Sequence, residues 1–111
     1  MLNEAQKRLN EWAQTLEEPY WPPLSQLAAL SEEVGEVARL LNHLYGSKPK
    51  KQEEARQELG GEIVDVIFAA MCLANAHGID LDAEFEKKMD KCYGRDKDRF
   101  AKKQLPEEQN G

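Results

Sequence analysis

Apolar residues recur every three or four positions along most of the chain, and this spacing predicts amphipathic helices. The first helical block covers roughly residues 2–17, and Trp12 lies on its apolar stripe, where we expect it to be buried. Prolines and glycines separate three further blocks, at about residues 24–45, 52–76 and 80–93. No stretch shows the alternation of a β-strand, and no segment repeats. Four helices with short connections predict an all-α fold of the four-helix-bundle type.

The third block contains nine consecutive apolar residues, from Val66 to Ala74. A helix that is apolar on every side needs cover all around it. A chain of 111 residues has too little other material to provide that cover. We therefore expect this helix to pack against a second copy, in a homodimer or homotetramer.

Two carboxylates, Glu62 and Asp65, stand at the beginning of this apolar run, three residues apart and hence neighbours on the helix surface. Placing them beside a buried segment is costly, because each loses hydration and each repels the other. The sequence between Leu59 and Glu86 contains no Lys or Arg to neutralise them. A compensating charge must come from elsewhere.

The second block carries a matching pair of carboxylates. At about 100° per residue, Glu33 falls inside the apolar sector of this helix and Glu36 falls at its edge, whereas Glu32 falls outside and is expected to be solvated. Four inward carboxylates on two helices would repel one another strongly. Hard divalent cations, Mg²⁺ above all, compensate such a cluster, and Mn²⁺ is a possible substitute.

Two other interpretations compete with this one. The glutamates could belong to solvated faces of ordinary amphipathic helices. A di-iron carboxylate bundle would instead require Glu-x-x-His motifs. Neither His43 nor His77 lies three residues after a glutamate, and both are placed to end helices, where an imidazole suits the helix dipole.

Composition narrows the classes of partner. The length suits one domain, which we place at residues 1–105, with a disordered tail at 106–111. A formal net charge of −6 argues against a nucleic-acid polymer or an anionic membrane surface as partner.

The N-terminus lacks the apolar core of a secretion signal, and no run is long enough to span a bilayer, so we expect a cytoplasmic protein. Cys72, in the apolar run, is expected to be a core residue.

The run Glu32-Glu33-Val34-Gly35-Glu36, followed after a spacer of 25 residues by Glu62-Ile63-Val64-Asp65, resembles the EExxE and ExxD motifs of the MazG-like nucleotide pyrophosphohydrolases. The resemblance extends over about residues 24–99 and includes a basic C-terminal stretch. It implies hydrolysis of a nucleoside triphosphate, (d)NTP, between the α and β phosphates. It also implies a metal site at Glu33, Glu36, Glu62 and Asp65.

Further residues are candidates for the chemistry and for substrate binding. Glu36, with Glu33 beside it, is the candidate for activating the attacking water. Trp21, in the proline-rich linker after Tyr20, could stack on a nucleobase. Three cations at helical spacing could bind phosphates, and the basic loop at 48–51 could help; the three are Lys88, Lys91 and Arg95.

Two alternative functions remain open at this point. Phosphoribosyl-ATP pyrophosphohydrolases share the metal motif. A non-catalytic helical interaction module would keep the bundle but would have no use for four inward carboxylates.

Overall fold

The computed structural model describes residues 1–46, 52–95 and 98–104, and the side chains of all of these except residues 52–57. The described residues form four helices and no strand, which confirms the all-α prediction: α1 (Leu2–Ala13), α2 (Pro23–Tyr45), α3 (Gln52–Ala76) and α4 (Leu81–Tyr93). Residues 1–80 form one compact unit, and a second begins at Leu81. The expected single domain stays a prediction, and the expected tail at 106–111 lies outside the described residues.

Helix α1 ends at Ala13, four residues before the predicted end, so this boundary was wrong. The backbone tightens after Ala13, where the N–H groups of Thr15 and Leu16 donate to carbonyls three residues back. The Thr15 hydroxyl also donates to the Trp12 carbonyl at 2.6 Å. Carbonyls at the end of a helix lack partners within the helix, and these short local bonds satisfy two of them.

The other helix ends lie close to the prolines and glycines that predicted them. Helix α2 begins at Pro23, at a first-turn position where the missing N–H of proline costs no hydrogen bond. Helix α3 is followed by Gly78 with φ +63°, a left-handed conformation that glycine adopts without strain. Asp80 directly precedes Leu81, the first residue of α4.

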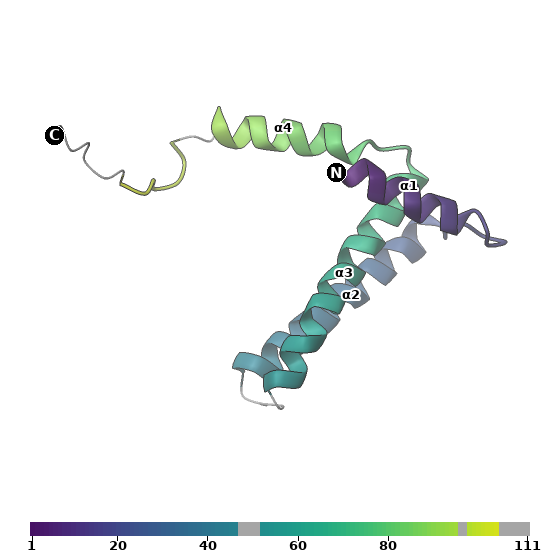
Figure 1. Ribbon diagram of the computed structural model, residues 1–111, viewed down its shortest axis with the longest axis horizontal. Helices are drawn as coiled ribbons and strands as arrows, with labels where there is room; N and C mark the ends of the chain where they lie inside the picture. Colours follow the sequence, from purple (N-terminus) through teal and green to yellow (C-terminus); the bar gives the residue numbers. More distant parts are fainter. Residues whose placement is uncertain (47–51, 96–97, 105–111) are drawn as a thin grey trace. The chain divides into compact units, whose positions relative to one another are not determined.

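Helices α2 and α3 lie side by side along most of their length, and α1 packs against α3 (Figure 1). Leu40 and Leu44, near the C-terminal end of α2, are buried, at 0% and 4% exposed. Leu59, in the first half of α3, packs against them. The burial of these apolar side chains stabilises the pairing of the two helices.

A hydrogen-bond network joins α1, the linker and the end of α3. The Gln6 amide donates to Asn75 Oδ1 at 3.0 Å and to the Ile79 carbonyl at 2.8 Å. Asn75 Nδ2 in turn donates to the Gln6 carbonyl at 3.0 Å and to the Tyr20 hydroxyl at 3.1 Å. The Tyr20 hydroxyl donates to Asn10 Oδ1 at 2.7 Å. These bonds fix the linker that carries Tyr20 and Trp21 against the helices.

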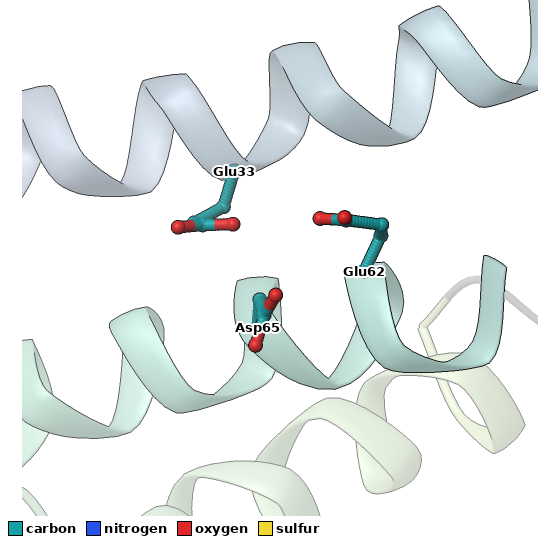
Figure 2. Close-up of side chains that lie close together, drawn as sticks. All are labelled: Glu33, Glu62 and Asp65. Carbon is teal, nitrogen blue, oxygen red and sulfur yellow. The ribbon is translucent and has the colours of Figure 1, made fainter. Parts of the chain in front are cut away.

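We expected no run long enough to span a bilayer, but the segment Glu58–Ala76 of α3 is long and apolar enough by length and composition, and only 11% of it is buried in the single chain. It nevertheless carries Glu62 and Asp65, which face α2 (Figure 2). Charged groups are expensive inside a bilayer. The segment packs against α2 and α1 of the same chain, and the cytoplasmic location stays a prediction.

Candidate metal centre

Three carboxylates meet between α2 and α3: Glu33 points from α2 toward Glu62 and Asp65 of α3 (Figure 2). One carboxylate oxygen from each residue lies within 4.8 Å of the others. Glu33 and Glu62 are half-buried and Asp65 is exposed. Three of the four residues predicted to hold a metal are therefore brought together.

The helical spacing explains this arrangement. Glu62 and Asp65 are three residues apart, so both project from the same side of α3. Glu33 projects from the side of α2 that packs on α3, while Glu32, one position earlier, is exposed. Leu40 and Leu44 of α2 pack against Leu59 of α3 farther along the pair, and this contact holds the helices, and with them the carboxylates, near one another.

The electrostatics of the cluster are unfavourable without a cation. Partial burial raises the pKa of Glu62 above its ordinary value of 4.5, and the negative charges of Asp65, Glu36 and Glu33 raise it further. The guanidinium of Arg39 lowers that pKa and offsets only part of this effect. A raised pKa in a group of facing carboxylates indicates that the site favours an added positive charge.

Glu36, the fourth predicted ligand, lies at the edge of this group. Its Oε2 accepts a hydrogen bond from Arg39 Nε at 2.9 Å, in an ion pair whose side chains are 45% and 47% exposed. Glu36 is near enough to act on the pKa of Glu62. An exposed pair of this kind is weak, so Glu36 could exchange Arg39 for another cation.

Beside the carboxylates lies a pocket of about 400 Å³, which Glu33 and Asp65 line on one side. The rest of its wall is mainly apolar and aromatic, and includes Trp12, Trp21 and Phe68. Trp12 and Phe68 meet edge to face, with ring centroids 5.9 Å apart. The pocket could hold a flat apolar group close to whatever the carboxylates bind.

The two tryptophans compare differently with expectation: Trp12 departs from it, whereas the stacking role of Trp21 stays a prediction. Trp12 was expected to be buried in the core, and this was wrong: its side chain is 54% exposed. The buried positions of α1 are Gln6, Leu9 and Ala13, and Trp12 lies beside that stripe, where it forms part of the pocket wall. Trp21 is 57% exposed and lines the same pocket, as a residue available for stacking would.

Cys72 also lines the pocket, and it is half-buried rather than a fully buried core residue. Burial raises the pKa of its thiol. A thiol with a raised pKa is mostly protonated and is a poor nucleophile or metal ligand. Cys72 therefore contributes shape to the pocket and no charge.

The predicted phosphate-binding cations lie in the second compact unit. Lys88 and Lys91 belong to α4, Lys88 being exposed and Lys91 half-buried, and Arg95 follows the helix and is exposed. The carboxylates belong to the first unit and these three cations to the second, so their role in phosphate binding stays a prediction. The basic residues predicted in the loop at 48–51 lie outside the described residues.

The donor set suits a hard divalent cation. All three clustered groups are carboxylates, and oxygen ligands are those that Mg²⁺ and Mn²⁺ prefer. No imidazole or thiolate belongs to the group of candidate ligands found in the described part of the chain, so a zinc site of the usual kind is not favoured.

Sequence reasoning missed three residues around this site: Gln26, Arg39 and Phe68. Gln26 lines the pocket and lies seven residues before Glu33, two helical turns away on the same face of α2. Arg39 lies three residues after Glu36. Both spacings were visible in the sequence, but spacing alone does not reveal which apolar or polar side chains line a pocket.

Known proteins provide an independent comparison. Residues 22–100 match the MazG nucleotide pyrophosphohydrolase domain family. The uncharacterized protein YpjD of Bacillus subtilis (strain 168) is 40% identical over 103 residues, which cover 93% of each chain.

Two solved structures are similar as well. One is the Bacillus-conserved MazG protein, a nucleotide pyrophosphohydrolase, with 35% identity, a TM-score of 0.74, and coverage of 89% of this chain and 96% of that one. The other is the YpjD protein of Bacillus subtilis, with 38% identity, a TM-score of 0.75, and coverage of 82% and 93%.

Proposed function

Because this chain belongs to the MazG nucleotide pyrophosphohydrolase family, we propose that it hydrolyses nucleoside triphosphates between the α and β phosphates, releasing a monophosphate and pyrophosphate. The family fixes the general activity, a hydrolase acting on nucleotides. The position of cleavage, the triphosphate substrate and the Mg²⁺ requirement belong to the proposal. The observation that carries it is the cluster of Glu33, Glu62 and Asp65 at the wall of an aromatic pocket.

Members of this family generally use a divalent metal, and we assign its binding here to Glu33, Glu36, Glu62 and Asp65. A bound Mg²⁺ would neutralise charge on the phosphate oxygens as it develops in the transition state. The carboxylates of this chain would hold the cation beside the pocket that Glu33 and Asp65 line. Glu36 joins them by releasing its contact with Arg39.

A water molecule must attack phosphorus, and a carboxylate must orient it or accept its proton. Glu36 is the first candidate, since it lies at the edge of the cluster and is partly open to solvent. Glu33 is the second, because it lies in the cluster and lines the pocket. Glu36→Gln tests this assignment at saturating Mg²⁺. If the remaining Mg²⁺-dependent rate lost its pH dependence, the proton transfer would be assigned to Glu36.

The pocket supports a place for the nucleobase. Trp21 and Phe68 offer apolar ring surfaces close to Glu33 and Asp65, so a nucleotide could place its base on the rings and its phosphates at the carboxylates. We propose Trp21 as a stacking contact. Trp21→Ala is then expected to raise KM for every base by a similar factor.

Phosphates also need direct cations, and the proposal keeps Lys88, Lys91 and Arg95 for the β and γ phosphates. Lys91→Ala or Arg95→Ala is expected to raise the KM for a triphosphate roughly tenfold, as the loss of one charge-assisted hydrogen bond would. The Mg²⁺ affinity of the free protein should stay the same in both variants. An unchanged KM in both would remove these residues from the site.

We further propose that the active protein is a homodimer or homotetramer. In the single chain, apolar side chains of α3 outside the pocket lining are exposed: Ile63 and Ile67 are each 44% exposed, and Val64 is 59% exposed. A second copy would cover such side chains and lower the free energy of the fold. Light scattering at micromolar concentration should show a dimer or tetramer, and a folded monomer would refute this part of the proposal.

A substrate panel tests the activity itself. Purified protein with Mg²⁺ is offered the four NTPs, the four dNTPs and phosphoribosyl-ATP, and the products are separated by ion-exchange chromatography. We expect monophosphate and pyrophosphate from at least one triphosphate. Release of phosphate and a diphosphate would instead mean cleavage at the γ phosphate, and preference for phosphoribosyl-ATP would assign a different substrate within the same fold.

A further inference from the structure

We infer that Gln26 is the residue that recognises the nucleobase, through hydrogen bonds from its side-chain amide to the hydrogen-bonding edge of the base. This inference rests on the proposed function, because it places the base of the nucleotide substrate in the pocket beside the carboxylates. It adds a specificity-determining residue to a site where Trp21 and Phe68 supply only stacking surface.

The observation behind it is an amide without partners. Gln26 is 5% exposed, and neither its Nε2 nor its Oε1 has a hydrogen-bond partner among the described residues. Buried polar side chains in folded proteins are nearly always hydrogen-bonded, because an unpaired one loses its hydration without compensation. An exception beside a candidate site calls for a partner that binds there.

The second buried glutamine of the same compact unit shows what an amide with a structural role looks like. Gln6 is 7% exposed, and its Nε2 donates to both Asn75 and Ile79. Its burial is accounted for within the chain. Gln26 has the same chemistry and a similar burial, but its partners are missing.

The position of Gln26 indicates which partner would fit. Gln26 lines the pocket together with Trp21, Phe68 and Glu33, and it also lines a second hollow that includes His77. A base stacked in the pocket would turn its edge toward one of the walls. Rotation about the side-chain torsions of Gln26 would bring the amide to that edge.

A glutamine amide offers one acceptor and two donor hydrogens, so it can pair with adjacent donor and acceptor groups on a base. Such a pair forms two bonds in a fixed geometry, as glutamine does with adenine in protein–DNA complexes. A carboxylate at this place would only accept hydrogen bonds, and it would add negative charge next to Glu33, Glu62 and Asp65. A neutral amide therefore suits a base next to three carboxylates.

The test removes the amide and keeps the shape. Gln26→Met has an unbranched side chain of similar length without polar atoms, and Gln26→Leu is a second variant of different shape. Each protein is assayed with Mg²⁺ on the four dNTPs and on 2-deoxyribose 5-triphosphate, a substrate that has no base. We expect the wild type to favour its best dNTP over the baseless substrate, and this ratio of kcat/KM to fall roughly tenfold or more in both variants.

Two controls separate recognition from stability. The kcat/KM for the baseless triphosphate should stay the same in the Gln26 variants, which shows that the carboxylates still function. Without nucleotide, Gln26→Met should melt at a higher temperature than the wild type, because an unpaired buried amide is gone. The matched variant Gln6→Met should melt at a lower temperature and keep the base ratio unchanged.

Specific outcomes would overturn the inference. If the wild type hydrolysed the baseless triphosphate as well as the dNTPs, the enzyme would not recognise the base, and Gln26 could have no such role. Unchanged ratios in both Gln26 variants would mean that the amide pairs with a structural water or another copy of the chain. If the wild type hydrolyses no triphosphate at all, the proposed function fails first, and the melting shift caused by added dNMP in wild type and Gln26→Met then decides whether Gln26 binds a base.

Discussion

Two stretches of the same helix pair use opposite chemistry. In the leucine stretch, Leu40 and Leu44 of α2 pack against Leu59 of α3, and the first two are almost fully buried. In the carboxylate stretch, Glu33 of α2 faces Glu62 and Asp65 of α3 within 4.8 Å. Apolar burial favours helix pairing in the first stretch, whereas like charges oppose it in the second.

The two stretches therefore have different roles: one stabilises the fold, and the other lowers its stability at a candidate functional site. The leucine stretch stabilises the helix pair, and that stability offsets the repulsion between the facing carboxylates. A carboxyl group with a raised pKa in a cluster beside a pocket, as Glu62 is here, is typical of functional sites. The following predictions separate the two stretches: variants of one should change activity, and variants of the other should change stability.

The largest effect is expected on activity. Glu33→Gln, Glu36→Gln, Glu62→Gln and Asp65→Asn should each lower Mg²⁺-dependent pyrophosphate release roughly a hundredfold or more, because a lost ligand weakens charge neutralisation at the phosphates. Glu32→Gln is the matched control on an exposed position, and it should be much milder. Steady-state rates at saturating Mg²⁺ measure this. If Glu32→Gln proved the most damaging of the five, the assignment of the inward face of α2 would be wrong.

The leucine stretch should respond in stability instead. Leu40→Ala leaves a cavity at a position that is 0% exposed, and is expected to lower the free energy of unfolding by about 2–5 kcal/mol. Leu41→Ala, next to it and 42% exposed, should cost far less. Urea unfolding followed by circular dichroism gives both values. Equal losses would indicate that Leu41 is buried in the assembled protein.

A smaller stability effect of opposite sign is expected in the carboxylate stretch. The pKa of Glu62 is raised in the folded chain, so its ionisation opposes folding, and stability is lost as the pH rises from 4.5 through the raised value. Without metal, Glu62→Gln should therefore melt above the wild type at pH 7.5, and the difference should shrink toward pH 4.5. Differential scanning calorimetry in EDTA measures this. A variant that melts below the wild type at pH 7.5 would contradict repulsion in the cluster.

The smallest effect is expected at the edge of the cluster. Arg39 and Glu36 form an ion pair that is about half exposed, and such pairs contribute roughly 0–1 kcal/mol. Arg39→Met should change the free energy of unfolding by no more than that, while Glu36 becomes free to bind Mg²⁺. Isothermal titration with Mg²⁺ should show equal or tighter binding. Clearly weaker binding would mean that Arg39 positions Glu36 as a ligand.

Much of the fold could be predicted from the sequence because helical signals are local. The spacing of Glu33, Glu62 and Asp65 against apolar neighbours predicted their inward placement, and the structure brings these three together. Proline and glycine marked the ends of α2 and α3 closely. The end of α1 was misplaced because the Thr15 hydroxyl and two backbone N–H groups tighten the chain before Pro19 is reached.

The remaining features depend on contacts between residues far apart in the sequence. Trp12 lies at the boundary of an apolar stripe, and only the position of Phe68 decides that it forms a pocket wall. Helical spacing places Gln6 and Gln26 on inner faces, but it does not tell which amide finds a partner. Asn75, 69 residues away from Gln6, makes that difference. Such pairings arise from the packing of helices and carry no local signal.

The central claim is that the carboxylate stretch is a metal centre for pyrophosphate release. The most direct test is a Mg²⁺ titration of pyrophosphate and monophosphate formation from a dNTP, with wild type and Asp65→Asn measured side by side. We expect saturable activation of the wild type, no release in EDTA, and a nearly inactive variant. Release that is independent of metal, or equal in the two proteins, would contradict the account.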